Sequence, residues 1–324
     1  MTSRAVLLPA TGDPFTLLFC LKFWKERWED EVDKIYVNLN SEYFPKEVIN
    51  ELLARLSDEP KIHIIYHPAP TRPHGQGIKE LVQVCQEDYV MLLENDAYIY
   101  KNNVVDRWFK KVESGEYDVV GSPRGSCTKE LYDWEVKTFN LDVSGYGDVG
   151  PNYWPNFFII KRENLLKTDL NFDSKEFPKG WERFMEDNAG DTFVWMSIQL
   201  HRMGLKFFNI PQHKASPTEF EDKENKQGNW YPPFQPMDYI HAGSLSSGWG
   251  GYMGDKPLPE MTEANKLEFE NRCAWWTIAC QDIEGFTKFH DDYLNGIARL
   301  IVRAGLNARN IDKKISLYKG IMGL

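Results

Sequence analysis

The sequence has little cysteine and no long apolar run. It contains five cysteines that show no CxxC or other zinc-ligand spacing: Cys20, Cys85, Cys127, Cys273 and Cys280. An odd and scattered set of this kind indicates buried thiols in a reducing compartment. No apolar stretch reaches the roughly 18 residues of a membrane-spanning helix, and the N-terminus has only a short apolar run before turn residues. We therefore expect a cytoplasmic protein with no membrane insertion.

The chain also lacks an excess of positive charge. Its formal net charge is -10 and its pI is near 5.3. Proteins that bind nucleic acids usually carry a basic surface, which disfavours nucleic acid as the partner. The segment from Arg299 to Lys319 is locally basic, so a nucleic acid partner is disfavoured but not excluded.

Two catalytic motifs are missing. The chain has no GxSxG segment, which argues against a serine hydrolase. The loop after the first apolar run, Pro9-Ala10-Thr11-Gly12-Asp13, lacks the second glycine and the cation of the GxGTR type that grips a triphosphate. This departure counts against a sugar nucleotidyltransferase. No internal repeat or low-complexity segment is present.

What the chain does have is length, apolar residues and aromatic side chains. Its 324 residues, 42% hydrophobic, suffice for one large domain or for a domain with a helical appendage. Aromatic residues make up 14%, and the eleven tryptophans are concentrated in the second half. Such side chains fit a carbohydrate or nucleotide site, and they also fill ordinary cores.

The first 120 residues alternate between strand and helix patterns. Apolar β-rich runs at 5–8, 34–38, 62–66 and 89–93 are separated by helical patterns at 14–27, 45–56 and 77–86. This order predicts an α/β fold with a mostly parallel sheet and helices on both faces. Ligands of such sheets bind beyond the carboxyl ends of the strands.

The second half is less regular. We expect strands at 118–121, 157–161 and 206–210, a helix at 192–203 that starts near Asp191, and a proline-rich loop at 211–236. Two helical segments follow between 260 and 305. The predicted organisation is a catalytic domain at 1–255, with a nucleotide half at about 1–120 and an acceptor half at about 121–255, and a C-terminal helical extension at 256–324.

The strongest chemical signal follows the fourth predicted strand. In Leu92-Leu93-Glu94-Asn95-Asp96-Ala97, an apolar run ends in two carboxylates one residue apart. If the backbone stays extended there, Glu94 and Asp96 face the same side and can converge on one hard cation. Mg²⁺ and Mn²⁺ prefer such oxygen ligands and keep positions open for phosphate oxygens.

This segment resembles the DxD motif of the GT-A family of glycosyltransferases, with Glu94 in the first acidic position and Asp96 in the second. The resemblance covers roughly residues 4–250. It implies a GT-A-like, Rossmann-type mixed sheet and the transfer of a sugar from a nucleoside diphosphate sugar, UDP- or GDP-linked, to a hydroxyl acceptor, a glycan being favoured. It also implies a Mn²⁺ or Mg²⁺ ion on Asp96, with Glu94 touching the metal or the donor instead.

Further segments fit the same scheme. The resemblance places the donor near Thr11, Gly12 and Asp13, where Asp13 alternatively caps a helix, and near Arg72, His74 and Gly75, which precede a helix N-terminus. Glu94, Asn95 and Trp249 complete the expected donor-binding set. A late histidine, His241, resembles the family's additional metal ligand, and the glycine-rich segment 246–251 is expected to close over the diphosphate.

An acidic cluster precedes the helix predicted at 192–203. Glu186, Asp187 and Asp191 lie within six residues, and inverting members of the family use such an acid as the general base that deprotonates the acceptor. The sequence leaves open which acid acts, and Asp191 also suits a helix N-cap. Further candidate sugar or acceptor contacts are Tyr146, Asp148, Trp154, Asn156 and Trp181.

The alternative function is a non-catalytic binding module, and a sugar nucleotidyltransferase is a less favoured one. A non-catalytic module that binds a nucleotide sugar or a glycan would need the same pocket but would not transfer the sugar. A glycosidase needs two carboxyl groups on opposite sides of a sugar, and Glu94 and Asp96 are too close in the chain for that arrangement.

Overall fold

The computed structural model describes residues 2–11, 14–40, 46–67, 73–123, 152–172, 192–210, 212–214, 234–236, 238–242, 263–282 and 287–324, together with residues 133, 136–138 and 140. Its centre is a seven-stranded sheet of order β3-β2-β1-β4-β7-β6-β8. The strands are β1 (Arg4–Thr11), β2 (Lys34–Asn40), β3 (Ile62–His67), β4 (Tyr89–Leu92), β6 (Val119–Pro123), β7 (Tyr153–Lys161) and β8 (Phe207–Asn209).

The sheet is parallel except at β7. Strands β1, β2, β3 and β4 run in one direction, and β6 pairs with β8 in parallel, whereas β7 pairs antiparallel with both β4 and β6. The expected mixed, mostly parallel α/β sheet is therefore confirmed. Because β7 is reversed, its beginning lies at the same edge as the carboxyl ends of β1 and β4.

Helices cover both faces of the sheet. The helices on the first face are α1 (Pro14–Phe23), α2 (Lys46–Ser57) and α4 (Val104–Glu113), and those on the second are α3 (His74–Val84), α6 (Arg162–Leu166) and α8 (Val194–Arg202). In β1, Val6 and Leu8 join the core of the first face and Leu7 that of the second. A strand buried on both faces needs this continuous apolar sequence.

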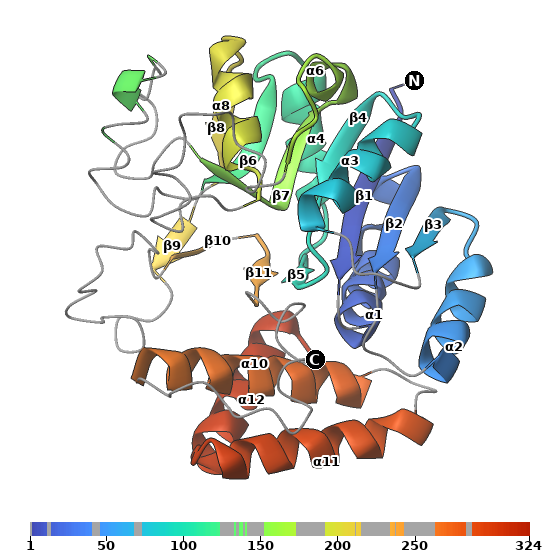
Figure 1. The fold of residues 1–324 in the computed structure, drawn as a ribbon, viewed down its shortest axis with the longest axis vertical. Coiled ribbons are helices and arrows are strands. Elements are labelled where there is room, and N and C mark those ends of the chain that lie inside the picture. The colour runs from blue at the N-terminus through green and yellow to red at the C-terminus, as the bar shows by residue number, and fades with distance from the viewer. Residues whose placement is uncertain are drawn as a thin grey trace.

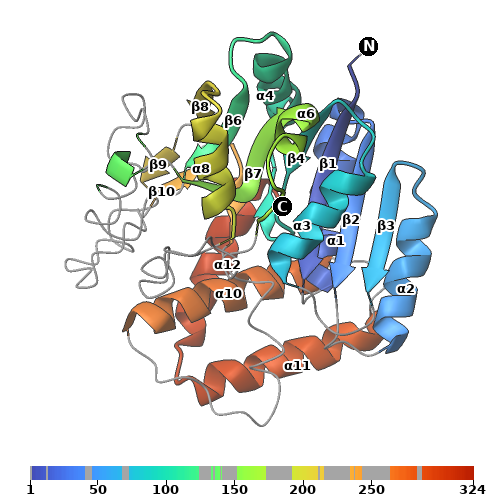
Figure 2. The same cartoon turned by 45° about the horizontal axis from the view of Figure 1, so that its top comes forward.

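Three C-terminal helices lie beyond the carboxyl ends of β1 and β2 (Figures 1 and 2). They are α10 (Glu263–Asp282), α11 (Thr287–Arg303) and α12 (Ala308–Met322). Trp276 of α10, Leu300 of α11 and Met322 of α12 belong to the same hydrophobic cluster as Val6 and Met91 of the sheet. The helices therefore share the core of the sheet domain. The boundary expected at 255/256 falls outside the described residues.

Several expected elements differ in detail. The helix expected at 14–27 ends at Phe23 and continues as a π-helical turn, Trp24–Trp28, and a short 3₁₀ turn, Glu29–Glu31. Trp24 and Trp28 of the π turn are both buried. The segment 211–236 is not entirely loop, because it contains the paired strands β9 (Gln212–Lys214) and β10 (Phe234–Pro236).

Two further observations bear on sequence expectations. Cys20, Cys85 and Cys273 are buried thiols, as the scattered spacing indicated. None of the helices in the described part of the chain is long and apolar enough to cross a membrane.

Candidate metal centre

The acidic segment after β4 forms a turn. Strand β4 ends at Leu92, and the backbone N–H of Ala97 donates to the carbonyl of Glu94 at 3.0 Å. The extended backbone that the sequence argument assumed for residues 94–96 is therefore wrong. The turn nevertheless leaves the carboxylates of Glu94 and Asp96 close enough to reach one common partner.

That partner comes from far along the chain. The short strand β11 (Ile240–His241) pairs antiparallel with β5 (Ala97–Tyr98), so that His241 lies opposite Ala97. The backbone N–H of Ala242 also donates to the carbonyl of Asp96 at 2.9 Å. These backbone bonds fix the imidazole of His241 beside the acidic turn.

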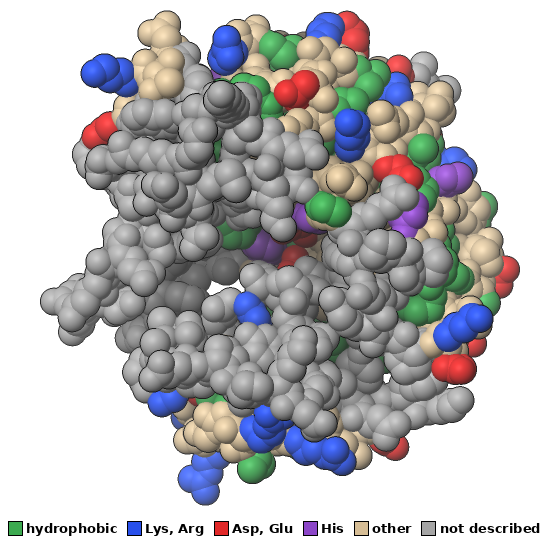
Figure 3. Space-filling view, viewed as in Figure 1, with side chains coloured by type: hydrophobic (Ala, Val, Ile, Leu, Met, Phe, Trp, Pro, Cys, Tyr) green, Lys and Arg blue, Asp and Glu red, His purple; other side chains and the backbone are tan. Residues whose placement is uncertain are grey.

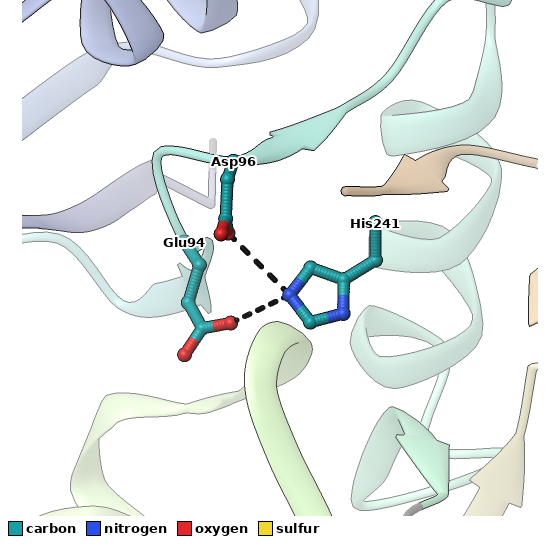
Figure 4. A group of neighbouring side chains, drawn as sticks. All are labelled: Glu94, Asp96 and His241. Carbon is teal, nitrogen blue, oxygen red and sulfur yellow. Dashed lines mark ion pairs between the residues drawn. The ribbon is translucent and has the colours of Figure 1, made fainter. Parts of the chain in front are cut away.

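The three side chains meet at one point (Figure 4). The Nε2 atom of His241 lies 3.1 Å from Oε2 of Glu94 and 3.4 Å from Oδ1 of Asp96. The three ligand atoms all lie within 4.8 Å of one another. On the other side of Glu94, Nε2 of His74, the first residue of α3, is 4.0 Å from Oε1.

Burial strengthens the interactions within this cluster. The side chain of Asp96 is 2% exposed, that of His241 10% and that of Glu94 19%. Burial acts to lower the pKa of His241, but the charge of Asp96 and the hydrogen bonds to Asp96 and Glu94 outweigh it and raise the pKa to about 10. A protonated imidazole would balance the charges of the buried Asp96 and the partly buried Glu94.

A second set of contacts holds the Nδ1 side of the ring. The amide of Asn156 lies 3.1 Å from Nδ1 of His241, and the hydroxyl of Tyr239 donates to Oδ1 of Asn156 at 3.1 Å. The indole of Trp154 meets the imidazole edge-on, with centroids 5.0 Å apart. Asn156 and Trp154 both come from the beginning of β7, which its reversed direction brings to this edge of the sheet.

The three converging ligand atoms suit a divalent cation. Two carboxylate oxygens and one imidazole nitrogen converge, and carboxylates favour Mg²⁺ or Mn²⁺ whereas imidazole favours transition ions. In the space-filling view, histidine and acidic side chains are visible near the centre of the face shown (Figure 3). The residues present therefore fit a divalent metal ion.

The other residues predicted to bind the sugar donor do not join this cluster in the described part of the structure. Gly75 is buried in the first turn of α3. Asn95 is 2% exposed, and its Nδ2 donates to Oγ1 of Thr16 on α1 at 2.7 Å, so its amide is held inside the protein. Thr11 is the last residue of β1. Gly12, Asp13, Arg72 and Trp249 lie outside the described residues, as do Tyr146, Asp148 and Trp181 and the segment 246–251.

The predicted catalytic acids Glu186, Asp187 and Asp191 also lie outside the described residues. The helix that follows them, α8, has Phe193 at its N-cap position, so the expectation that Asp191 caps this helix is wrong. Asn156, which the sequence suggested as an acceptor contact, is 3% exposed and is engaged by His241 and Tyr239 instead.

Sequence reasoning missed the residues that anchor the segment preceding His241. The carboxylate of Asp238, 8% exposed, accepts from the indole N–H of Trp108 at 3.1 Å and pairs with Arg107. Both partners lie on α4. An acid directly before a β-rich run, Tyr239-Ile240-His241, was the available signal, but a single aspartate gives no indication of its distant partner.

Comparisons with known proteins agree with this architecture. A model of the family described as Glycosyl transferase family 2 matches residues 6–178, more than half of the chain. No curated protein matches the chain. The matched segment includes Glu94 and Asp96 and ends before β11, so His241 lies outside it.

Solved structures give weaker likenesses. The bifunctional IspDF from Campylobacter jejuni is 12% identical over 66% of this chain and 50% of that protein, with a TM-score of 0.36. Glucosyl-3-phosphoglycerate synthase from Mycobacterium tuberculosis, in complex with Mn²⁺ and UDP-glucose, is 14% identical over 52% of this chain and 58% of that protein, with a TM-score of 0.37. The alignments thus span about half the length of these structures.

The family match confirms the resemblance that the acidic turn and the order of the strands indicated. It covers β1 to β7, the part of the sheet that ends at the candidate metal centre. The chain belongs to glycosyl transferase family 2 and has the GT-A type of fold.

Proposed function

We propose that this protein transfers a sugar from a nucleoside diphosphate sugar to a hydroxyl acceptor, using a divalent cation held by Asp96, Glu94 and His241. The observation that carries the proposal is the convergence of these three side chains at the carboxyl edge of a sheet whose sequence matches a glycosyltransferase family. Ligands of such sheets bind at that edge. A cation there would neutralise the charge that develops on the leaving diphosphate.

The mixed oxygen and nitrogen donor set favours Mn²⁺ over Mg²⁺, because Mg²⁺ is usually held by oxygen ligands alone. His74 stands at the N-terminus of α3 beside Glu94. A helix N-terminus favours anions, so we assign the diphosphate to the space between α3 and the acidic turn. UDP- and GDP-sugars are the proposed donors and a glycan is the favoured acceptor.

The general base is assigned to the acidic cluster before α8. One of Glu186, Asp187 and Asp191 would accept the proton of the acceptor hydroxyl as its oxygen attacks the anomeric carbon, if transfer inverts the configuration. A base in this segment would act on the acceptor, while Asp96, Glu94 and His241 act on the donor.

A thermal-shift screen tests the donor site. UDP-, GDP-, CMP- and dTDP-sugars would be added with and without Mn²⁺ to the wild type, to Asp96→Ala and to Asp58→Ala, an exposed acid used as the control. A ligand that binds only the folded state raises its stability. We expect one donor to stabilise the wild type and Asp58→Ala in the presence of Mn²⁺, and to leave Asp96→Ala unshifted. No shift with any donor up to millimolar concentration would contradict the proposal.

A transfer assay separates the enzyme from a binding module. With the donor identified, release of nucleoside diphosphate would be followed over a panel of glycan acceptors. Acceptor-dependent release that requires Asp96 supports the transferase. Donor binding without release on any acceptor favours the non-catalytic module.

A further inference from the structure

Asn156 occupies a central position behind the candidate metal centre. It is 3% exposed, and both ends of its amide have partners. Nδ2 lies 3.1 Å from Nδ1 of His241, and Oδ1 accepts from the hydroxyl of Tyr239 at 3.1 Å. The amide therefore links the ring that faces the two carboxylates to a phenol on the same short segment as that ring.

The chemistry of the imidazole decides which end of the amide is needed. A histidine that gives its Nε2 lone pair to a cation carries its proton on Nδ1, and that N–H requires an acceptor. A doubly protonated ring has the same requirement at Nδ1. An amide nitrogen can only donate, so it suits neither form, whereas an amide oxygen suits both.

The amide of Asn156 can supply that oxygen by exchanging its two ends. The oxygen and nitrogen of a side-chain amide have nearly the same size and are assigned from the hydrogen-bond network. With Oδ1 toward His241, Nδ2 donates to the hydroxyl oxygen of Tyr239. The phenol oxygen can accept this bond, and the hydroxyl of Ser122 is a further hydrogen-bond partner of the phenol. The Nδ1 proton of His241 then has an acceptor, and so does the N–H of the amide that faces Tyr239.

We propose that Asn156 is a positioning residue that fixes the tautomer of His241, by accepting the Nδ1 proton so that Nε2 is free to bind the cation. The inference rests on the proposed cation site and adds to it a buried residue that touches neither donor nor metal. Tyr239 supports the orientation by switching from donor to acceptor. Residues outside the ligand set that orient a metal-binding histidine commonly change metal affinity by about 10- to 100-fold when they are replaced.

Two substitutions test the role of the oxygen. Asn156→Leu removes the acceptor but keeps the branching and the number of side-chain heavy atoms, and we expect the Kd for Mn²⁺ alone, measured by calorimetry, to rise about 10- to 100-fold. Asn156→Asp keeps an acceptor toward Nδ1 and another toward the hydroxyl of Tyr239, and we expect its Kd to stay near that of the wild type. A role in packing alone does not depend on an oxygen at this position, so equal Kd values for the two variants would overturn the inference.

Asn209→Leu is the matched control. Asn209, on β8, also accepts a hydrogen bond from a tyrosine hydroxyl, that of Tyr153. We expect its Kd for Mn²⁺ to equal that of the wild type. A rise as large as that of Asn156→Leu would overturn the inference. Wild-type affinity in Asn156→Leu would also overturn it while leaving the cation site standing. Absence of Mn²⁺ binding by the wild type would remove the cation site and the inference together.

A spectroscopic measurement keeps the test decisive if Asn156→Asp does not fold. In protein labelled with ¹⁵N-histidine and saturated with diamagnetic Mg²⁺, the signals of His241 are identified by their loss in His241→Gln. We expect a proton on Nδ1 in the Mg²⁺-bound wild type. An unprotonated Nδ1 in that state would contradict the proposal directly.

Discussion

The indole of Trp275 on α10 lies against the phenol ring of Tyr98 on β5, with ring centroids 5.5 Å apart. Trp275 also stacks on Tyr318 of α12 at 4.1 Å. Since β5 pairs with the strand that carries His241, the C-terminal helices support the backbone of the candidate metal centre.

We therefore expect Trp275→Ala to destabilise the whole domain. Removing a buried large aromatic side chain typically costs about 3–5 kcal/mol. Urea denaturation followed by circular dichroism should show one transition at lower urea. The control is Val302→Ala on α11, where the side chain is 79% exposed and the effect should stay within about 0.5 kcal/mol. A separate early transition, with the sheet unaffected, would indicate that the helices form an independent unit.

A second prediction concerns the close contact between β6 and β7. A Cβ atom at Gly121 would lie 2.6 Å from the ring of Tyr153 and 2.9 Å from that of Phe158. Because both rings are fully buried, Gly121→Ala should cost about 1–3 kcal/mol through overpacking. Gly320→Ala in α12 is the matched change, since nothing lies within 4 Å of its Cβ, and it should instead stabilise by about 0.5–1 kcal/mol. Equal effects of the two substitutions on the free energy of unfolding would contradict the packing described for this strand pair.

The raised pKa of His241 predicts how stability depends on pH when divalent cations are chelated. A group whose folded-state pKa is about 10, against an ordinary 6.5, contributes stability that is fully present below 6.5 and is lost as the pH rises toward 10. In EDTA, the free energy of unfolding of the wild type should fall over this range more steeply than that of His241→Gln. Parallel pH profiles for the two proteins would show that His241 holds no extra proton in the fold.

The acidic cluster before α8 gives a kinetic prediction that depends on the proposed transfer reaction. Among Glu186→Gln, Asp187→Asn and Asp191→Asn, one substitution should lower the transfer rate by about 10²- to 10⁴-fold, the range typical of a general base. The thermal shift caused by the donor should remain. If all three variants keep rates within about tenfold of the wild type, the base does not belong to this segment.

The sequence predicted the part of the fold that depends on local pattern. The apolar runs of β1 to β4 and the helices between them were predictable because each run is long enough to show its period. Helix α4 was missed, although Val105, Trp108, Phe109 and Val112 have helical spacing, because it follows the acidic turn after only a short connection. The reversed direction of β7 could not be predicted, since both directions produce the same apolar run, Phe157 to Ile160.

Part of the candidate site could also be predicted from local sequence patterns. Glu94, Asp96 and His241 belong to residue types and positions that suggest a metal, and the structure brings them together. Asn156, Tyr239 and Asp238 act through contacts between segments distant in the chain, and no local pattern identifies such partners. Asn95 was expected to contact the donor, whereas its side chain is buried and donates to Thr16.

The pairing of β5 with β11 also bears on which insertions and deletions the sequence can tolerate in evolution. It joins residues 97–98 to residues 240–241 across a long closed loop of chain. The entropic cost of closing such a loop grows only logarithmically, by about 0.6 kcal/mol for each doubling of its length. The intervening chain also contains β6, β7 and α8 of the sheet domain, so insertions and deletions are cheap in free energy only at positions outside such elements. Changes of length at those positions leave Asp96 and His241 side by side, because the β5–β11 pair itself is unchanged.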